Sequence, residues 1–326
     1  MCPHQWPRAG LGAAGLALLL GCGSGTRLVE PRSRGAASFA AVDWDEPLNL
    51  GAAINSGSSE LQLGVAPNGR SLFVSSNRAG TLGNQDLWVS ERQPEGNWGP
   101  LVNLGAVVNS DSLDSSPTLS LDGHYLYFSS RRRGGLGGLD CWRSYRVDAS
   151  DDFGWQSPEN LGPPVNSTFD DADCLPRRTA SGGETLWFTS FNRPGGKGDW
   201  DIYTSEIAPD GTFGPATPVE ELNTAARETR MTLTGNGMTV IFTSNRAGGL
   251  GNIDLWMAQR PAPNMPFCSP VNLGAPVNST ANDRSPSITT NGDELYFTST
   301  RPGGSGSDDV YLVTRVAGLG PRDCRP

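Results

Sequence analysis

Residues 240–256, VIFTSNRAGGLGNIDLW, contain a pattern of spaced residues that occurs five times in the chain. Counted from its arginine, glycine follows after two and five residues, aspartate after eight, and an aromatic residue after ten. The five pairs of arginine and aspartate are Arg78 and Asp86, Arg132 and Asp140, Arg193 and Asp201, Arg246 and Asp254, and Arg301 and Asp309. Five copies at so fixed a spacing predict a repeat architecture.

The surrounding sequence predicts four short antiparallel strands in each repeat. A turn-rich stretch such as NLGAPVNS, from Asn272, precedes a first strand, of which Pro117–Leu121 is an example. An Asn-Gly, Asp-Gly or Gly-Gly pair follows, and these residues tolerate the positive φ of a tight hairpin turn. The repeated Arg and Asp lie on the loop between the second and third strands. An aromatic residue and a proline mark a fourth strand, which the proline places at the sheet edge.

Four antiparallel strands per repeat are typical of a propeller blade. The five arginines are separated by 54, 61, 53 and 55 residues, and the last repeat ends near Thr314 without a fourth strand. Residues 42–50, VDWDEPLNL, resemble a fourth strand that lacks the first three. We therefore predict an all-β fold, a single five-bladed propeller over residues 43–316. The N-terminal strand closes it by pairing with the last blade, which removes two open sheet edges.

The strand, loop and strand around Ser244-Asn245-Arg246, Gly248-Gly249, Gly251 and Asp254-Leu255-Trp256 resemble the TolB-like, WD-like propeller repeats of bacterial envelope proteins. The resemblance covers roughly 270 residues. It implies a periplasmic or cell-surface platform that binds protein segments near a central channel. TolB-like propellers have six blades and a separate α/β domain, whereas this chain predicts five blades and no such domain, so a role in the Tol system does not follow.

The N-terminus predicts export. Residues 1–21 contain an apolar run from Ala9 to Leu20, which is too short to span a bilayer as a helix, for which about 20 residues are needed. Leu19-Leu20-Gly21-Cys22 resembles a lipoprotein cleavage site, which implies lipidation of Cys22 and an anchor in the outer membrane, on its periplasmic or cell-surface side. An ordinary signal peptide containing a cysteine is the alternative. Residues 22–42 are expected to be a flexible tether, and residues 317–326 a C-terminal tail.

The amino-acid composition limits the classes of partner that the protein can bind. The formal net charge is −9, and the longest basic run is Arg131-Arg132-Arg133. Nucleic-acid binding needs clustered cations and is therefore not expected. We expect a monomer that contacts the membrane only through its lipid anchor. Its expected partner is an envelope protein or peptide, with a glycan as a further possibility.

Four cysteines remain after the predicted leader and lipid site, Cys141, Cys174, Cys268 and Cys324. Four cysteines in an exported protein allow three pairings. Pairing Cys141 with Cys174 would join neighbouring repeats, and pairing Cys268 with Cys324 would fix the tail. Four free, buried thiols are the alternative. The spacing matches no metal site, because CxxC and a nearby histidine are both lacking.

Residues that every blade carries are best explained by what every blade needs, so the repeated Arg and Asp are predicted to be structural. The third repeat departs most from the others, and we take its polar residues as a candidate binding face, namely Asp170, Asp171, Asp173, Lys197, Asp199 and Trp200. Tryptophan and lysine beside carboxylates suit a peptide or a sugar. The alternative is an insertion without a partner. Calcium is a weaker possibility for the acids, because the alternating ligand pattern is lacking.

An enzyme is the second class of function to consider. A Ser-His-Asp triad needs a histidine, and His124 lies in the Asp122-Gly123 turn, on the face opposite the repeated loops. A glycosidase needs only two or three carboxylates at a central pocket. The acids that begin the innermost strands are Glu60, Asp114, Asp171 or Asp173, Glu228 and Asp283. We predict a non-catalytic, protein-binding propeller, with a glycoside hydrolase or carbohydrate-binding protein as the alternative and no cofactor.

Overall fold

The computed structural model describes residues 44–179 and 182–316. The chain divides into two units, Met1–Ala37 and Ser38–Pro326, and the described residues all belong to the second. The predicted leader, the tether with Cys22, and the tail with Cys324 lie outside the described residues. Among residues 44–179 and 182–316 there is no helical segment with the length and apolar character that a membrane span requires.

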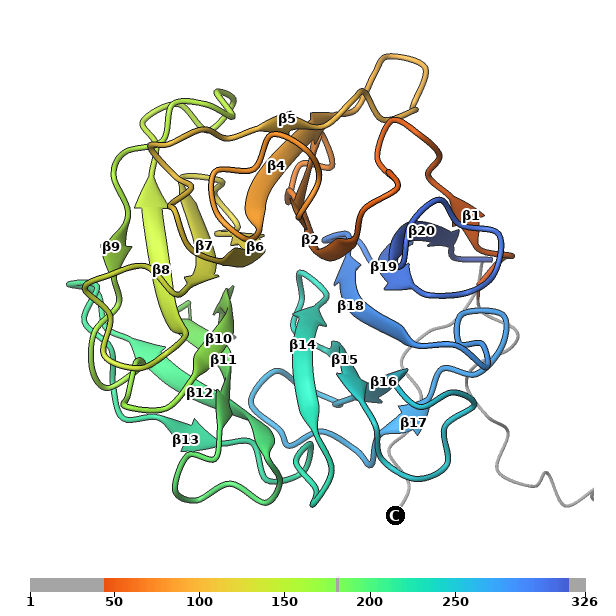
Figure 1. Ribbon diagram of the computed structural model, residues 1–326. Helices are drawn as coiled ribbons and strands as arrows, with labels where there is room; N and C mark the ends of the chain where they lie inside the picture. Colours follow the sequence, from red (N-terminus) through yellow and green to blue (C-terminus); the bar gives the residue numbers. More distant parts are fainter. Residues whose placement is uncertain (1–43, 180–181, 317–326) are drawn as a thin grey trace, which may run out of the picture. The chain divides into compact units, whose positions relative to one another are not determined.

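The described residues form five four-stranded antiparallel sheets around a centre, as Figure 1 shows, which confirms the predicted five-bladed propeller. Blade 1 contains β2 (Glu60–Val65), β3 (Ser71–Ser76), β4 (Asp86–Glu91) and β5 (Val102–Asn103), and blade 2 contains β6 (Asp114–Leu119), β7 (Tyr125–Ser130), β8 (Asp140–Tyr145) and β9 (Glu159–Asn160). Blade 3 contains β10 (Asp171–Arg178), β11 (Glu184–Phe191), β12 (Trp200–Ile207) and β13 (Thr217–Pro218), and blade 4 contains β14 (Glu228–Leu233), β15 (Thr239–Ser244), β16 (Asp254–Gln259) and β17 (Val271–Asn272). Blade 5 contains β18 (Asp283–Ile288), β19 (Glu294–Ser299), β20 (Asp309–Thr314) and β1 (Leu48–Asn49).

The N-terminal strand closes the ring as predicted. β1 is the outermost strand of blade 5, with Leu48 opposite Leu312 and Asn49 opposite Tyr311. Trp44 forms a further antiparallel bridge with Arg315 and is buried in the same apolar cluster as Tyr311. The first described residues therefore supply the strand that the last repeat lacks.

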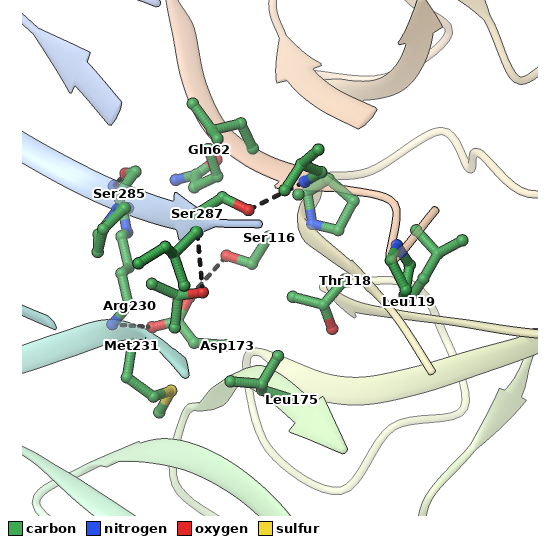
Figure 2. A pocket seen from close by; sticks show the side chains of 18 of the residues that line it. Gln62, Ser116, Thr118, Leu119, Asp173, Leu175, Arg230, Met231, Ser285 and Ser287 are labelled. Carbon is green, nitrogen blue, oxygen red and sulfur yellow. Dashed lines mark hydrogen bonds between the residues drawn. The ribbon is translucent and has the colours of Figure 1, made fainter. Parts of the chain in front are cut away.

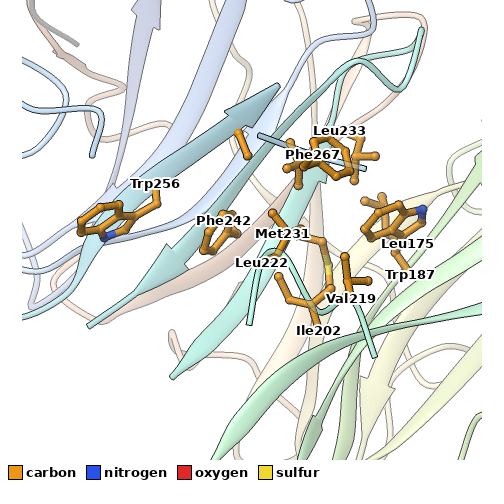
Figure 3. Packing of buried hydrophobic residues seen from close by; sticks show 12 residues of the cluster. Leu175, Trp187, Ile202, Val219, Leu222, Met231, Leu233, Phe242, Trp256 and Phe267 are labelled. Carbon is orange, nitrogen blue, oxygen red and sulfur yellow. The ribbon is translucent and has the colours of Figure 1, made fainter. Parts of the chain in front are cut away.

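Apolar side chains fill the space between neighbouring blades. Figure 3 shows the cluster between blades 3 and 4, where Trp187 of one blade meets Phe267 of the next in an edge-to-face contact at 6.0 Å. Trp187 lies on β11, and Phe242 of β15 is buried in the same cluster. Such burial, at about 25 cal/mol per Å² of apolar surface, is what holds flat blades against one another.

A disulfide crosses one blade boundary. Cys141 on β8 of blade 2 is bonded to Cys174 on β10 of blade 3, with their Cα atoms 6.1 Å apart and both side chains fully buried. This is the pairing that would join neighbouring repeats. Cys268 is disulfide-bonded as well, and Cys324, the other cysteine of the second pairing considered, lies outside the described residues.

Candidate functional site at the central channel

The repeated arginine binds the acid that begins the innermost strand of its own blade. The five ion pairs are Arg78–Glu60 at 2.8 Å, Arg132–Asp114 at 2.6 Å, Arg193–Asp171 at 3.3 Å, Arg246–Glu228 at 3.0 Å and Arg301–Asp283 at 2.7 Å. All five carboxylate side chains are 0% exposed. Each guanidinium also lies within 5.0–5.6 Å of the aromatic ring ten residues later. These contacts hold the blade together and leave the five acids without a face toward a ligand.

The repeated aspartate fixes the shape of its own loop. In blade 1, Asp86 accepts hydrogen bonds from the backbone N–H of Leu82 at 2.8 Å and of Gly83 at 3.3 Å, and from the Asn103 side chain at 2.8 Å. Gly83 cannot be replaced without a clash, because an added Cβ would lie 1.9 Å from the Ser112 carbonyl oxygen. The loop aspartates thus bind backbone rather than solvent.

The position two residues after each buried acid forms the wall of the central channel. We call these five residues the channel ring, and they are Gln62, Ser116, Asp173, Arg230 and Ser285. In blades 2 to 5 a β-bulge interrupts the register at this position, and the ring residue has a positive φ between 52° and 58°. Such a bulge re-aims a side chain. At this height of the channel the blades present glutamine, aspartate, arginine and, in two blades, serine, whereas the residue two positions earlier is an acid in every blade.

Side-chain hydrogen bonds join the channel ring from blade to blade (Figure 2). Asp173 accepts from the Ser116 hydroxyl of blade 2 at 2.7 Å and from the backbone N–H of Arg230 of blade 4 at 3.0 Å. The Arg230 guanidinium donates to Ser285 Oγ of blade 5 at 2.8 Å, and Ser285 Oγ donates to the Leu61 carbonyl of blade 1 at 2.8 Å. This chain of contacts therefore runs through all five blades.

A cavity of about 220 Å³ opens above the ring on the side of the repeated loops, and we call it the mouth cavity. Its lining combines polar and apolar surface and includes Arg131, Arg227, Arg230 and Arg284, the amide residues Gln62, Gln85 and Asn245, and Trp200. Asp173 is the one carboxylate among the described residues that line it. Below the ring the channel narrows to a cavity of about 40 Å³, whose lining is similarly mixed and includes Arg177.

Three of the predicted binding-face residues lie at the mouth or beside it. Asp173 and Trp200 line the mouth cavity, and the Trp200 ring packs against Phe191 at 5.5 Å between centroids. Asp199 binds the guanidinium of Arg227 at 2.8 Å, which lowers the pKa of its carboxyl below the ordinary value. The tryptophan therefore lies where a ligand in the mouth would meet it.

Asp170 is a fourth predicted residue beside the mouth, because its partner Arg131 lines the cavity, whereas Asp171 and Lys197 lie elsewhere. Asp171 is fully buried and bonded to Arg193 and Ser167, so it does not belong to an open face. Burial raises the pKa of Asp171 against the opposing effect of these partners. Asp170 bonds Arg131 at 3.2 Å, and Lys197 bonds Glu220 at 2.8 Å on the surface. The three acids of this loop thus point to separate partners, and among the described residues no group of three metal-ligating side chains converges on one point.

Sequence reasoning did not identify the arginines of the mouth or four of the five ring residues. Arg131, Arg227 and Arg284 lie just outside the repeated skeleton, so the repeat offers no reason to select them. The signal for the ring was present, because aligned repeats read Gln, Ser, Asp, Arg and Ser two residues after the invariant acid. When one position differs between repeats whose neighbouring residues are the same, the fold does not determine the residue type at that position.

Comparisons with known proteins show the fold. No family model matches the chain, and no curated protein matches it. Among solved structures, a thermostable family-43 glycoside hydrolase has 14% identity and a TM-score of 0.57, covering 84% of this chain and 97% of the hydrolase. An endo-arabinase from Bacteroides thetaiotaomicron has 14% identity and a TM-score of 0.54, covering 84% of this chain and 98% of the endo-arabinase. At these identities the likeness concerns the architecture alone.

TolB from Acinetobacter baumannii is also among the similar structures, with 17% identity over 79% of this chain and 55% of TolB. Its TM-score of 0.47 is too low to support an argument from structure. The architecture is therefore shared with the glycoside hydrolase and the endo-arabinase, and the residues at the channel must distinguish between functions.

Proposed function

We propose that this protein binds a carbohydrate at the mouth of its channel and does not cleave it. The observation that carries the proposal is the composition of the mouth cavity, where Trp200 lies among guanidinium, amide and hydroxyl groups. A sugar ring has an apolar face that suits an aromatic surface, and hydroxyl groups that suit several fixed polar side chains. The partner class therefore changes from the protein segment expected from sequence to a glycan.

Cleavage is disfavoured by the carboxylates. Glycoside hydrolysis canonically uses two of them, about 5–5.5 Å apart in retaining enzymes and about 6.5–9.5 Å apart in inverting ones. Among the described residues that line the two channel cavities, Asp173 is the single carboxylate. Its oxygens already accept from Ser116, Thr189 and Arg230. The buried acids Glu60, Asp114, Asp171, Glu228 and Asp283 are held by arginine and line neither cavity.

The similar structures support a sugar as the ligand class. A glycoside hydrolase and an endo-arabinase share the architecture over more than 80% of this chain. In this proposal the present chain keeps a site for a polar ligand at the channel and lacks the second carboxylate that hydrolysis needs. Binding without turnover follows from that difference.

The test is a glycan array followed by calorimetry on the glycans that bind. Trp200→Ala should weaken binding about tenfold or more, since it removes the aromatic surface of the mouth. Phe153→Ala is the matched control, because Phe153 is 52% exposed and lines neither channel cavity. Absence of any bound glycan on a broad array, or equal binding by both variants, would contradict the proposal.

A protein partner is the second candidate, and a different observation favours it. Leu82, Leu136 and Leu250 occupy the same position of the repeated loop in three blades, and they are 53%, 49% and 51% exposed. Apolar residues repeated on one face suit a protein surface. Replacing all three by serine should abolish capture of an envelope protein in crosslinking experiments and leave glycan binding unchanged, if the loops carry that function.

The cellular location of the protein is proposed from its sequence alone. We propose that Cys22 carries lipid and anchors the propeller to the outer membrane. Metabolic labelling with a fatty-acid analogue should mark the wild-type protein and not Cys22→Ala. Equal labelling of both proteins, or none in the wild type, would refute the anchor while leaving the channel proposal untouched.

A further inference from the structure

Arg230 differs from the other arginines of the mouth cavity. Arg131, Arg227 and Arg284 each bind an aspartate, namely Asp170 at 3.2 Å, Asp199 at 2.8 Å and Asp308. Arg230 forms no ion pair with any of the residues that the structure describes. Its one side-chain hydrogen bond to a described residue runs from Nη1 to Ser285 Oγ at 2.8 Å. Its Nε and Nη2 donate to no described protein group.

Asp173, the carboxylate of the channel ring, already accepts several hydrogen bonds. Asp173 accepts from the Ser116 hydroxyl at 2.7 Å, from the Thr189 hydroxyl at 2.8 Å, and from the backbone N–H of Arg230, not from its guanidinium. The Asp173 side chain is therefore held by hydroxyl and amide donors. The positive charge of Arg230 lies in the channel wall without a bonded counterion among the described residues.

Arg230 is partly buried in the channel wall. Burial lowers the pKa of Arg230, and the charge of Asp173 opposes that effect while Arg284 adds to it. Its Nε and Nη2 are not among the buried side-chain atoms of the described residues that lack a hydrogen bond, so both donors are open to the cavity. The bulge that places it is common to four blades, but only blade 4 carries a cation there. Serine at this position in blades 2 and 5 shows that the fold itself does not require arginine.

We infer that Arg230 binds the carboxylate of a uronate unit in the glycan that occupies the mouth cavity. The inference rests on the proposed function and specifies its ligand as an acidic carbohydrate. A guanidinium presents parallel donors that match the two oxygens of a carboxylate, and Nε and Nη2 of Arg230 provide such a pair. Trp200 lines the same cavity and would contact the sugar ring. Of the four arginines that line the cavity, Arg230 is the one without an ion pair to a described residue, so its charge is available to an acidic ligand.

The experiment compares an acidic oligosaccharide with its own neutral derivative. Oligogalacturonide and the fully methyl-esterified form have the same sugar rings and differ in the carboxylate. The wild-type protein should bind the acid form roughly tenfold or more tightly, the scale of one charge-assisted hydrogen-bonding contact. Arg230→Met should remove that difference, and Arg230→Lys should keep part of it because it keeps charge but not the paired donors. Arg133→Met, a change at an exposed arginine outside both channel cavities, should have no effect.

The possible outcomes distinguish the role of Arg230 from the existence of a glycan site. Equal binding of both forms, with loss of both in Trp200→Ala, overturns the role of Arg230 and keeps the glycan site. No binding of either form, together with no glycan on the array, overturns both. If circular dichroism shows that Arg230→Met does not fold, Arg230→Lys carries the test of the residue, and an unchanged preference for the acid form in a folded Arg230 variant overturns the role of Arg230.

Discussion

The backbone N–H of Arg230 donates to Asp173 Oδ2 at 3.0 Å, so a side chain of blade 3 is bonded to the innermost strand of blade 4. The same carboxylate accepts from Ser116 of blade 2 at 2.7 Å. One buried group therefore joins three blades at the channel wall. The Asp173 carboxylate in the channel therefore stabilises the contacts between blades.

Asp173→Ala should lower the free energy of unfolding by about 2–4 kcal/mol, because three donors lose their acceptor in a buried place. Asp173→Asn keeps one oxygen and should cost about half as much. Urea unfolding measures both, and Asp210→Ala, at an exposed loop position, is the control. A loss for Asp173→Ala no larger than that of the control would show that the ring does not hold the blades together.

The buried ion pairs of the blades predict a non-additive pair of mutations. Arg246→Met should destabilise the protein by about 3–5 kcal/mol, because Glu228 remains buried without its cation. Adding Glu228→Gln removes the charge and should restore more than half of the loss, as measured by denaturant midpoints. If the double variant is less stable than Arg246→Met, the pair is not the source of the effect.

Closure of the ring predicts a strong effect at its N-terminal strand. Trp44 is 7% exposed in a cluster with Tyr311 and Val313, so Trp44→Ala should cost about 3–5 kcal/mol. Leu48 lies on the same strand segment but is 62% exposed, and Leu48→Ala should change stability by less than about 0.5 kcal/mol. Thermal unfolding of the two variants side by side checks the contrast, and similar melting temperatures would argue against the closure.

The sequence predicted the blades and the closure of the ring but not most residues of the channel. The five-fold skeleton and the unpaired strand near Trp44 sufficed for the blades and their closure, because each repeat must satisfy the same backbone. Most residues that face the channel could not be predicted from the sequence. The bulge at Arg230 and Ser116 interrupts the alternation of inward and outward side chains from which the inner face of a strand is recognised. The mouth arginines come from different points of different blades, and only folding brings Arg131 and Arg284 to one cavity.

Blade 3 predicts a dependence of stability on alkaline pH. Burial raises the pKa of Tyr203 to about 12, and the hydroxyl donates to the Arg193 carbonyl at 3.0 Å. Above about pH 10 the unfolded state loses this proton while the folded state keeps it, so stability falls as pH rises from about 10 to about 12. Tyr203→Phe should reduce this fall by no more than about 3 kcal/mol, as measured by urea unfolding across that range. An unchanged slope in the variant would assign the effect to other groups.

Binding of a glycan without cleavage is tested by following both its affinity and its length in one sample. A glycan chosen from the array is titrated into wild-type protein and Trp200→Ala by calorimetry, and its length is then determined by chromatography after prolonged incubation. We predict binding that is about tenfold weaker or worse in Trp200→Ala, with the glycan recovered at its original length. Shortened products that disappear with Asp173→Asn would contradict this result and establish an enzyme.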